Sequence, residues 1–359
     1  MAARTTLSMR PPAWSSPDAC SVTPSRFALA LADAAEQRGC RVALDPQSGQ
    51  AGALDLPDGR RVFFVGTQID LNTQAAAALA RDKYWCLSVL AARGLTGPTS
   101  HLIHAPTHRD YIARTRPDLA ARLPGPETAK DWAEMIGYPL IAKPNEGAAG
   151  RQVTFVSSPE ALHDAVADIL STDKTALLQE FLDGREYRLL YLDGELLNAV
   201  ERHRPHVKGN GSASLKTLLE RYFSNNAGQN RVPDLAPNDP RIPSFLAQSG
   251  LALTDVPKDG THVPLLPQAN LSLGATVTDA TSSLPPDLIA LGRKAVAALG
   301  LRLAGVDLIV PKVGAPTVLE VNAAPGFTQT SDQLAGEPPL LEMVCHKIIS
   351  AVMNPEQSR

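Results

Sequence analysis

Two apolar runs near the C-terminus each carry acidic side chains, and this pattern constrains the fold more than any other feature of the chain. Asp307 interrupts the first run, residues 303–310. Glu320 and Asn322 lie two residues apart at the end of the second run, which covers 317–321. Side chains alternate between the two faces of a strand, so Glu320 and Asn322 share one face. Because an unpaired charge is costly inside an apolar sheet, we expect these side chains to meet a ligand.

These three polar side chains are the candidate metal ligands. If the two runs pair through the turn at 311–316, Asp307 can join Glu320 and Asn322 on one face. Two carboxylates and an amide oxygen are hard ligands that suit Mg²⁺, with Mn²⁺ as a second possibility. Acids near strand ends can also be simply solvated, but the apolar neighbours on both sides favour the metal site.

Composition bounds the class of protein. A length of 359 residues suits two or three packed subdomains. The net charge is −3, so we expect neither nucleic acid nor a membrane as a partner. The four cysteines form no CxxC pair and are typical of reduced thiols. Residues 1–25 lack the apolar stretch of a signal peptide, and no run approaches the roughly 20 apolar residues that cross a bilayer. We therefore expect a cytoplasmic protein.

A cationic site is predicted upstream of the acids. Lys143 lies in an apolar run directly before the loop 145–150, which is rich in Gly and Ala. Gly147 and Gly150 allow the backbone of such a loop to approach a ligand closely. Backbone N–H groups with a nearby lysine can hold a polyphosphate, although the Gly-Lys-Ser/Thr of a Walker A loop is absent. Alone, this loop would favour an ordinary hairpin.

Further polar residues follow in the next β-type runs. Arg188 and Arg202 lie in consecutive runs and could hold phosphoryl charge, although a surface salt bridge fits each one equally well. The backbone of 179–182 could offer a donor and an acceptor to a purine edge, with Glu180 accepting from its amino group. Glu186 could accept from ribose hydroxyls. By spacing alone this last pattern specifies nothing.

The remaining chain is assigned more coarsely. We expect a flexible lead-in over 1–24, then a small α/β unit, and a helix from Asp82 to about Arg93. Residues 101–130 are predicted to be a loop with one helix near 111–116, and the polar stretch 223–245 an excursion. Helices are further expected to open at 158–160 and to lie near 214–222, 287–299 and 339–353, with hairpins around 193–194 and 311–316.

The order of these segments resembles the ATP-grasp ligases from residue 25 onward. The resemblance rests on Asp82-Lys83 before a helix, Pro139–Pro144, the loop 145–150, Gln179–Leu182, Gly184–Arg188, Gly305–Asp307 and Glu320–Gly326. Within that class, the chain looks most like the ATP-grasp part of cyanophycin synthetases and of bifunctional glutathione synthetases. Glu201-Arg202 with His206-Val207 and Gly209-Asn210-Gly211, and Ala269–Ser272 with Val277–Asp279, have the look of that group. Gly305 stands where D-alanine ligases carry an arginine, so that activity is not expected.

The resemblance implies an α+β fold in which two α+β subdomains clamp ATP, preceded by a small α/β domain. It implies ATP and Mg²⁺ as cofactors, with phosphates on Lys83 and Lys143. The same resemblance places adenine at Glu180 and Leu182 and ribose at Glu186, with Arg188 and Arg202 near the transferred phosphoryl group and the metal on Asp307, Glu320 and Asn322. The expected domains are a flexible segment 1–24, a pre-ATP-grasp domain 25–81, a helix and linker 82–137, a lid subdomain 138–182 and a C-terminal subdomain 183–359.

The expected activity is an ATP-dependent carboxylate–amine ligase that forms an amide bond through an acyl phosphate and releases ADP and phosphate. Its substrates are expected to be an amino acid or short peptide and an amine. The alternatives are a phosphotransferase on the same fold and a non-catalytic nucleotide-binding protein. A homodimer is a further possibility that the resemblance suggests.

Seven residues are candidates for contact with the substrate. They come from the loop that precedes the helix near 214–222 and from the segment before 277: His206, Gly209, Asn210, Gly211, Asn270, Ser272 and Gly274. A surface position explains His206 equally well.

Overall fold

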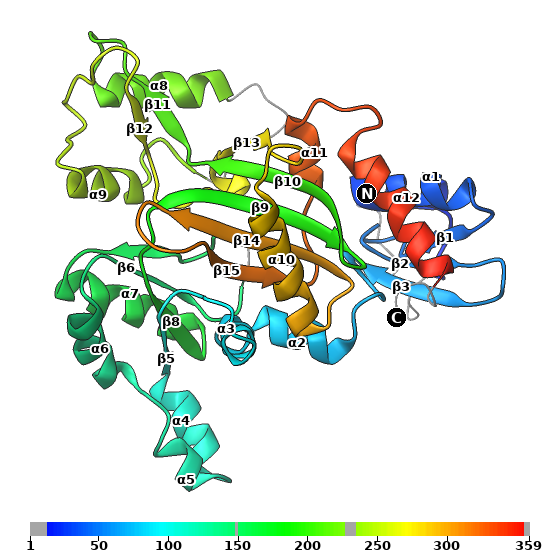
Figure 1. Ribbon diagram of the computed structural model, residues 1–359, viewed down its shortest axis with the longest axis horizontal. Helices are drawn as coiled ribbons and strands as arrows, with labels where there is room; N and C mark the ends of the chain where they lie inside the picture. Colours follow the sequence, from blue (N-terminus) through cyan, green and yellow to red (C-terminus); the bar gives the residue numbers. More distant parts are fainter. Residues whose placement is uncertain (1–12, 148–149, 227–234, 355–359) are drawn as a thin grey trace, which may run out of the picture.

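Four antiparallel sheets organise the fold, and helices cover one face of each of the larger ones (Figure 1). The computed structural model describes residues 13–147, 150–226 and 235–354. Every strand pair among these residues is antiparallel. The mixture of helices and antiparallel sheets agrees with the expected α+β class.

The N-terminal sheet is closed by helices from both ends of the sequence. Its strands are β1 (Arg41–Leu44), β2 (Ala51–Asp55), β3 (Arg61–Val65) and β4 (Gln68–Ile69). Helix α1 (Arg26–Glu36) begins after Ser25, whose side chain accepts a hydrogen bond from the N–H of Ala28. It packs with α12 (Leu340–Met353) in one apolar cluster, in which Leu31 and Ile348 are fully buried. The α/β unit therefore shares its core with the C-terminal helix.

The flexible lead-in expected over 1–24 is wrong for its described part. Residues 17–19 form a short 3-10 helix, η1 (Pro17–Ala19), and Ser15 bridges to Leu44 of β1 through two backbone hydrogen bonds. Pairing with the free edge of β1 satisfies backbone groups that a polar, proline-rich composition does not reveal. Residues 1–12 lie outside the described part.

The largest sheet has five strands in the order β13-β10-β9-β14-β15. Helices α10 (Pro286–Leu299), α2 (Gln74–Arg81) and α3 (Lys83–Ala92) pack on one face of this sheet, around Tyr191 and Leu189. Helix α3 starts at Asp82, as predicted, because its carboxylate accepts from the N–H of Trp85. Both expected hairpins are present. The strands are β9 (Gly184–Leu192), β10 (Glu195–His203), β13 (Thr276–Asp279), β14 (Leu303–Pro311) and β15 (Thr317–Asn322).

A smaller sheet, in the order β5-β8-β6-β7, lies beside the five-stranded one (Figure 1). Its strands are β5 (Ser100–His104), β6 (Leu140–Pro144), β7 (Thr154–Val156) and β8 (Thr175–Glu180). Helices α6 (Ala129–Ile136) and α7 (Pro159–Thr172) bury one face. Helix α7 begins at Ser158, whose side chain accepts from the N–H of Ala161.

The loop expected over 101–130 is wrong. Residues 100–104 form β5, the edge strand of the small sheet, and pair with β8 from Ser100 opposite Gln179 to His104 opposite Thr175. Helices α4 (Pro106–Ala113) and α5 (Pro117–Ala120) follow, each with a proline in its first turn, and then η2 (Pro126–Thr128). The expected helix at 111–116 thus lies earlier in the chain. The histidines and the serine of 100–104 give this segment little apolar alternation, and its partner strand β8 is distant in sequence. The edge strand was therefore not predicted.

A separate unit is inserted between β10 and β13. It contains β11 (His206–Lys208), α8 (Leu215–Asn226), α9 (Arg241–Gln248) and β12 (His262–Pro264) around its own apolar cluster. Of the excursion expected over 223–245, residues 223–226 belong to α8, residues 241–245 to α9, and residues 235–240 form a turn before α9. Residues 227–234 lie outside the described part. Short elements η3 (Leu271–Leu273) and α11 (Thr328–Gln333) complete the described chain. None of its helices is long and apolar enough to cross a membrane.

The packing of α12 against α1 yields a stability prediction. We expect Ile348→Ala to lower the free energy of unfolding by about 2–5 kcal/mol, because it leaves a cavity in a fully buried site. Met135 of α6 is 72% exposed, and Met135→Ala should change this energy by no more than about 0.5 kcal/mol. Chemical denaturation of both variants checks the pair. Equal stabilities would contradict the shared core.

Candidate active site

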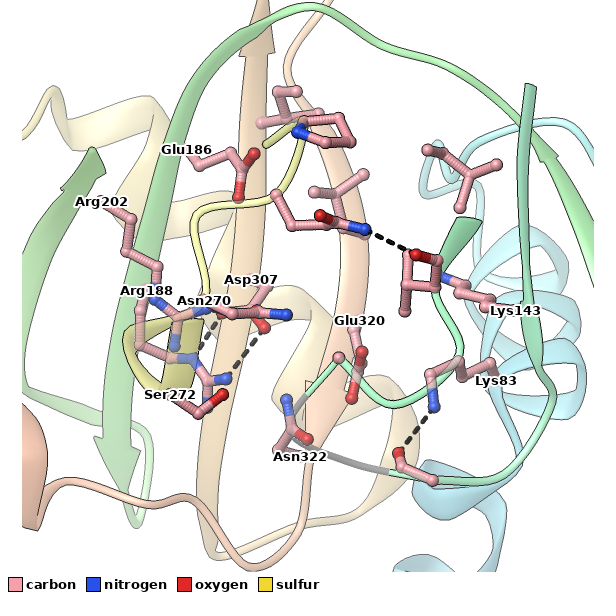
Figure 2. Close-up of a pocket in the computed structure, with 18 of the residues that line it drawn as sticks. Lys83, Lys143, Glu186, Arg188, Arg202, Asn270, Ser272, Asp307, Glu320 and Asn322 are labelled. Atoms are coloured by element: carbon pink, nitrogen blue, oxygen red, sulfur yellow. Dashed lines mark hydrogen bonds and ion pairs between the residues drawn. The ribbon is translucent and has the colours of Figure 1, made fainter. Parts of the chain in front are cut away.

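A cavity of about 560 Å³ lies between the small sheet and the five-stranded sheet. Its walls contain most of the polar residues predicted from the sequence, and Figure 2 shows that they converge from both sides. The predicted residues that line it are Lys83, Lys143, Gly147, Gly150, Glu180, Leu182, Glu186, Arg188, Arg202, Asn270, Ser272, Asp307, Glu320 and Asn322.

The register of the five-stranded sheet explains this convergence. Arg188 of β9 is opposite Asp307 of β14, which is in turn opposite Glu320 of β15. Glu186 is opposite Arg202 of β10. Because opposed residues share a face, these side chains all point away from the helix-covered side. The hairpin of β14 and β15 therefore brings Asp307 and Glu320 together, as the sequence predicted.

Asp307 is paired with both arginines. The Nε and Nη2 atoms of Arg188 donate to its two carboxylate oxygens, the latter at 2.9 Å from Oδ2, and Nη1 of Arg202 lies 3.3 Å from Oδ1. The side chains of Arg188, Arg202 and Asp307 are only 15%, 12% and 16% exposed, so water screens these pairs weakly. Burial lowers the pKa of Arg202, while Asp307 raises it. A surface salt bridge was the alternative predicted for each arginine. The structure instead shows both arginines in largely buried salt bridges with Asp307.

Glu320 and Asn322 of the same sheet have side chains that suit a hard cation. The Nδ2 atom of Asn322 is buried and has no hydrogen-bond partner among the described residues. With Asp307, the donor set is two carboxylates and one amide, which suits Mg²⁺. Three or more acidic, His or Cys side chains in metal-binding proximity do not occur in the described chain, so the third ligand would be the amide of Asn322.

The loop after β6 is tied to the start of α3. Lys83 is buried, and its Nζ donates to the carbonyl oxygen of Gly147 at 2.9 Å (Figure 2). Asn145, which the sequence reasoning missed, is 2% exposed and accepts the N–H of Tyr84 on Oδ1 at 3.0 Å. An Asn directly after a strand commonly accepts nearby backbone N–H groups, so its position was the available signal. Residues 148–149 of this loop lie outside the described part.

The segment before β13 contacts the other end of the same loop. Gln268, also missed by the sequence reasoning, donates from Nε2 to the carbonyl of Val153 at 2.9 Å. Gly150 packs directly against Asn270, since an added Cβ would lie 2.1 Å from its Nδ2. Gly150 has a φ of 71°, a conformation that glycine adopts without strain. The glycine loop is therefore held from two sides.

The connection between the two sheets is also fixed by specific contacts. The Oε1 atom of Glu180 accepts the N–H of Thr99 at 2.7 Å, so one of its oxygens is already engaged. The next residue, Phe181, packs edge-to-face on Phe155 of β7, and the guanidinium of Arg204 lies 5.8 Å from its ring centroid. These contacts attach the small sheet to β10 of the larger one.

Known proteins resemble this chain in sequence and in fold. The cyanophycin synthetase of Trichormus variabilis is 32% identical over 271 residues, which cover 73% of this chain and 28% of that protein. A bifunctional glutathione biosynthesis protein of Streptococcus agalactiae is 27% identical over 199 residues, 52% of this chain and 26% of its own length. The bifunctional glutathione synthetase structure from Pasteurella multocida superposes with a TM-score of 0.55 at 20% identity, covering 91% of this chain and 44% of that one. The chain resembles the ATP-grasp ligases and has their fold. No family model matches it.

The ATP-grasp resemblance therefore holds, and with it the α+β ATP-grasp fold. The chain spans less than a third of the length of the cyanophycin synthetases that it matches, as the 28% coverage shows. The domain boundaries and the roles of single site residues remain predictions. The predicted roles are supported for those residues that line the cavity together.

Five residues expected at the substrate do not line the cavity: His206, Gly209, Asn210, Gly211 and Gly274. The His206 ring lies against that of His262, with centroids 4.7 Å apart, and the Asn210 side chain accepts from the N–H groups of Ser212 and Ala213. Gly274 ends η3 in a left-handed conformation. Their assignment to the substrate stays a prediction, whereas Asn270 and Ser272 do line the cavity.

Two buried groups in this ATP-grasp cavity have perturbed acidities. Burial lowers the pKa of Lys143 to about 8, with Glu320 acting in the opposite direction. Burial also raises the pKa of Glu186, which Arg204 and Arg202 partly offset. A lysine with this pKa is only partly charged in mildly alkaline solution. An anion bound beside it would favour the charged form.

The acidity of Lys143 predicts the pH dependence of nucleotide binding. Below about pH 8 the ammonium is already charged, and above that pH an anionic ligand must bind together with a proton. We expect the dissociation constant of Mg-ATP to rise between pH 8 and 9.5, by up to roughly tenfold per pH unit. Lys143→Arg, which stays charged, should flatten this dependence. Equilibrium titrations across this range check it, and a constant affinity in the wild type would contradict it.

Proposed function

We propose that the chain is an ATP-dependent ligase that joins a carboxylate to an amine and releases ADP and phosphate. One observation carries the proposal. Lys143 of the small sheet lines the same cavity as Arg188, Asp307 and Glu320, which are opposed on neighbouring strands of the larger sheet. Relatives named as cyanophycin synthetase and glutathione biosynthesis protein support it.

The chemistry follows from the reactivity of a carboxylate. A free carboxylate does not form an amide readily, so ATP must first phosphorylate one of its oxygens. The resulting acyl phosphate is attacked by the amine, and phosphate leaves. Transfer of the phosphoryl group depends mainly on positioning and on balancing its charge. Lys143, Arg188 and Arg202 would supply that charge from a poorly screened cavity.

ATP-grasp ligases use ATP and Mg²⁺. In this chain Asp307, Glu320 and Asn322 would hold the ion, which neutralises phosphate charge when bound. Lys83 would act on the phosphates largely through the loop, since its Nζ holds the carbonyl of Gly147. A metal ion would compete for Asp307 with the arginines that hold it.

The nucleoside is assigned to the end of the cavity near the connection between the sheets. The backbone of Glu180 and Leu182 would meet the adenine edge, and Glu186 the ribose. Ile141 and Ile309 line the cavity from opposite sheets and would enclose the base. Because one oxygen of Glu180 accepts from Thr99, its contact to adenine is assigned to the backbone and the second oxygen.

The substrate pair is proposed to be an amino acid or short peptide and an amine. Asn270 and Ser272 are the residues assigned to contact it, because they line the cavity beside the glycine loop. Substrate phosphorylation without ligation, and nucleotide binding without turnover, are the two other functions that one assay can separate.

Phosphate release from Mg-ATP, measured with amino acids and dipeptides singly and in pairs, tests the reaction. We expect release that depends on a pair, and a product one water lighter than the sum of the two by mass spectrometry. A single substrate that gains a phosphoryl group would instead identify a phosphotransferase. Nucleotide binding without release across a broad panel would count against the ligase.

Glu320→Gln tests the metal assignment. Loss of this ligand should lower turnover by a factor of about 10²–10³ while the protein stays folded, because charge in the transition state is less well balanced. Glu195→Gln is the matched control, since that carboxylate is 62% exposed and pairs with Lys347 outside the cavity. Near-normal turnover in Glu320→Gln would contradict the assignment.

A further inference from the structure

Asp307 has two sets of competing partners. In the structure both of its carboxylate oxygens are bonded to arginines: Arg188 donates to each, and Arg202 lies 3.3 Å from Oδ1 (Figure 2). The proposed function gives the same oxygens to a metal ion. The three contacts use three of the roughly four lone-pair sites of this carboxylate, so at most one remains for a cation while both arginines are bound. The arginines and a metal ion therefore compete for Asp307.

The sheet is built to receive Arg188 in this pairing. The side chain lies over Gly305, two residues before Asp307 on the same face of β14. A Cβ at position 305 would be 2.6 Å from Nη1 of Arg188 and 2.8 Å from Cβ of Pro325. Glycine at this position thus opens the space that the guanidinium occupies, which ties the pairing to the backbone of the strand.

The pairing is also selective. Asp307 and Glu320 are directly opposed on neighbouring strands, yet both arginines bond to Asp307. The two ion pairs of the arginines both end on Asp307, whereas Glu320 interacts electrostatically with Lys143 of the small sheet. Glu320 is free to bind a cation, whereas Asp307 must exchange partners.

We propose that Asp307 masks a phosphate-binding site formed by Arg188 and Arg202, and that a divalent cation removes the mask. This inference rests on the proposed function and adds a preference for metal-bound over metal-free polyphosphate. A polyphosphate that arrives without metal must compete with the Asp307 carboxylate for the two guanidinium groups. One that arrives with Mg²⁺ offers Asp307 and Glu320 a cation, and the arginines are released to the phosphate oxygens.

The exchange discriminates between Mg-ATP and metal-free ATP. With the mask in place the two arginines and Asp307 carry a net charge of +1, and without it the arginines carry +2. Discrimination therefore comes from a group inside the anion site rather than from the metal site alone. Any binding of metal-free ATP by the native protein would be weak for the same reason.

The test compares ATP binding in EDTA with binding in Mg²⁺, by isothermal titration of the whole chain. Asp307→Asn removes the mask and should tighten binding of metal-free ATP by about tenfold, as expected for charge-assisted bonds that no longer face competition. Glu320→Gln is the charge-matched control from the same row of the sheet. It should tighten metal-free binding by no more than roughly threefold, because it frees no arginine. Mg²⁺ should strengthen ATP binding in the wild type far more than in Asp307→Asn.

Equal gains in the two variants, or no gain in Asp307→Asn, would overturn the mask while leaving the ligase proposal intact. Failure of the wild type to bind Mg-ATP would instead remove the proposed function and the mask with it. A structure of the wild type with Mg²⁺ and ADP decides the matter without substitution. The Nη2 of Arg188 should then lie beyond the roughly 4 Å reach of an ion pair from Asp307. An unchanged pair in that complex would overturn the proposal even if Asp307→Asn cannot fold.

Discussion

The contact of Asp307 with Arg188 and Arg202 is the constraint on which the rest of the site depends. It joins three neighbouring strands, β10, β9 and β14, on the face of the sheet that helices do not cover. Charges can stand in the middle of a sheet only if they are paired and if the opposite face supplies the hydrophobic core. That core is provided by α10, which packs over Leu189 and Tyr191. Because side chains alternate along each strand, the apolar residues that stabilise the sheet lie on one face and the charged residues of the cavity lie on the other.

A second chain of contacts positions the small sheet over those charges. Lys143 projects from β6 into the cavity, and the loop that follows is bonded to the start of α3 through Asn145 and Lys83. Helix α3 in turn belongs to the core of the five-stranded sheet. The glycine loop is therefore fixed relative to the metal candidates by its contacts with the start of α3. Burial at this junction is also what lowers the pKa of Lys143.

The sequence predicted those parts of the site that depend on local alternation. A short hairpin sets the register of β14 and β15, so Asp307, Glu320 and Asn322 could be placed on one face without a structure. The pairing of Asp307 with Arg188 could not be predicted, because the two residues are 119 positions apart and either arginine could have formed a surface salt bridge. The edge strand β5 was missed for a similar reason. Ser100 to His104 carries little apolar signal of its own and becomes a strand only by pairing with β8.

The predicted substrate residues that do not line the cavity show the limit of a local pattern. Gly209, Asn210 and Gly211 lead into a bend over 211–213, but nothing in such a motif says which side of a neighbouring unit it faces. That unit folds around its own apolar cluster, which includes Leu215, Leu265 and Leu266. Its packing is therefore largely independent of the five-stranded sheet, and it can change in sequence without disturbing the paired charges.

Among the described residues of this unit, those that line the cavity come from the segment that leaves it. This segment runs from β12 to β13 and brings Gln268 to the carbonyl of Val153 and Asn270 to Gly150. A change in the inserted unit could therefore reach the small sheet through these contacts and through Phe245 of α9, whose ring packs edge-to-face on Phe155 of β7. The charged side chains of the cavity are held by strand register, whereas the residues proposed to contact the substrate lie in the segment between β12 and β13. A resemblance carried by the strands consequently indicates the reaction class better than it indicates the substrate.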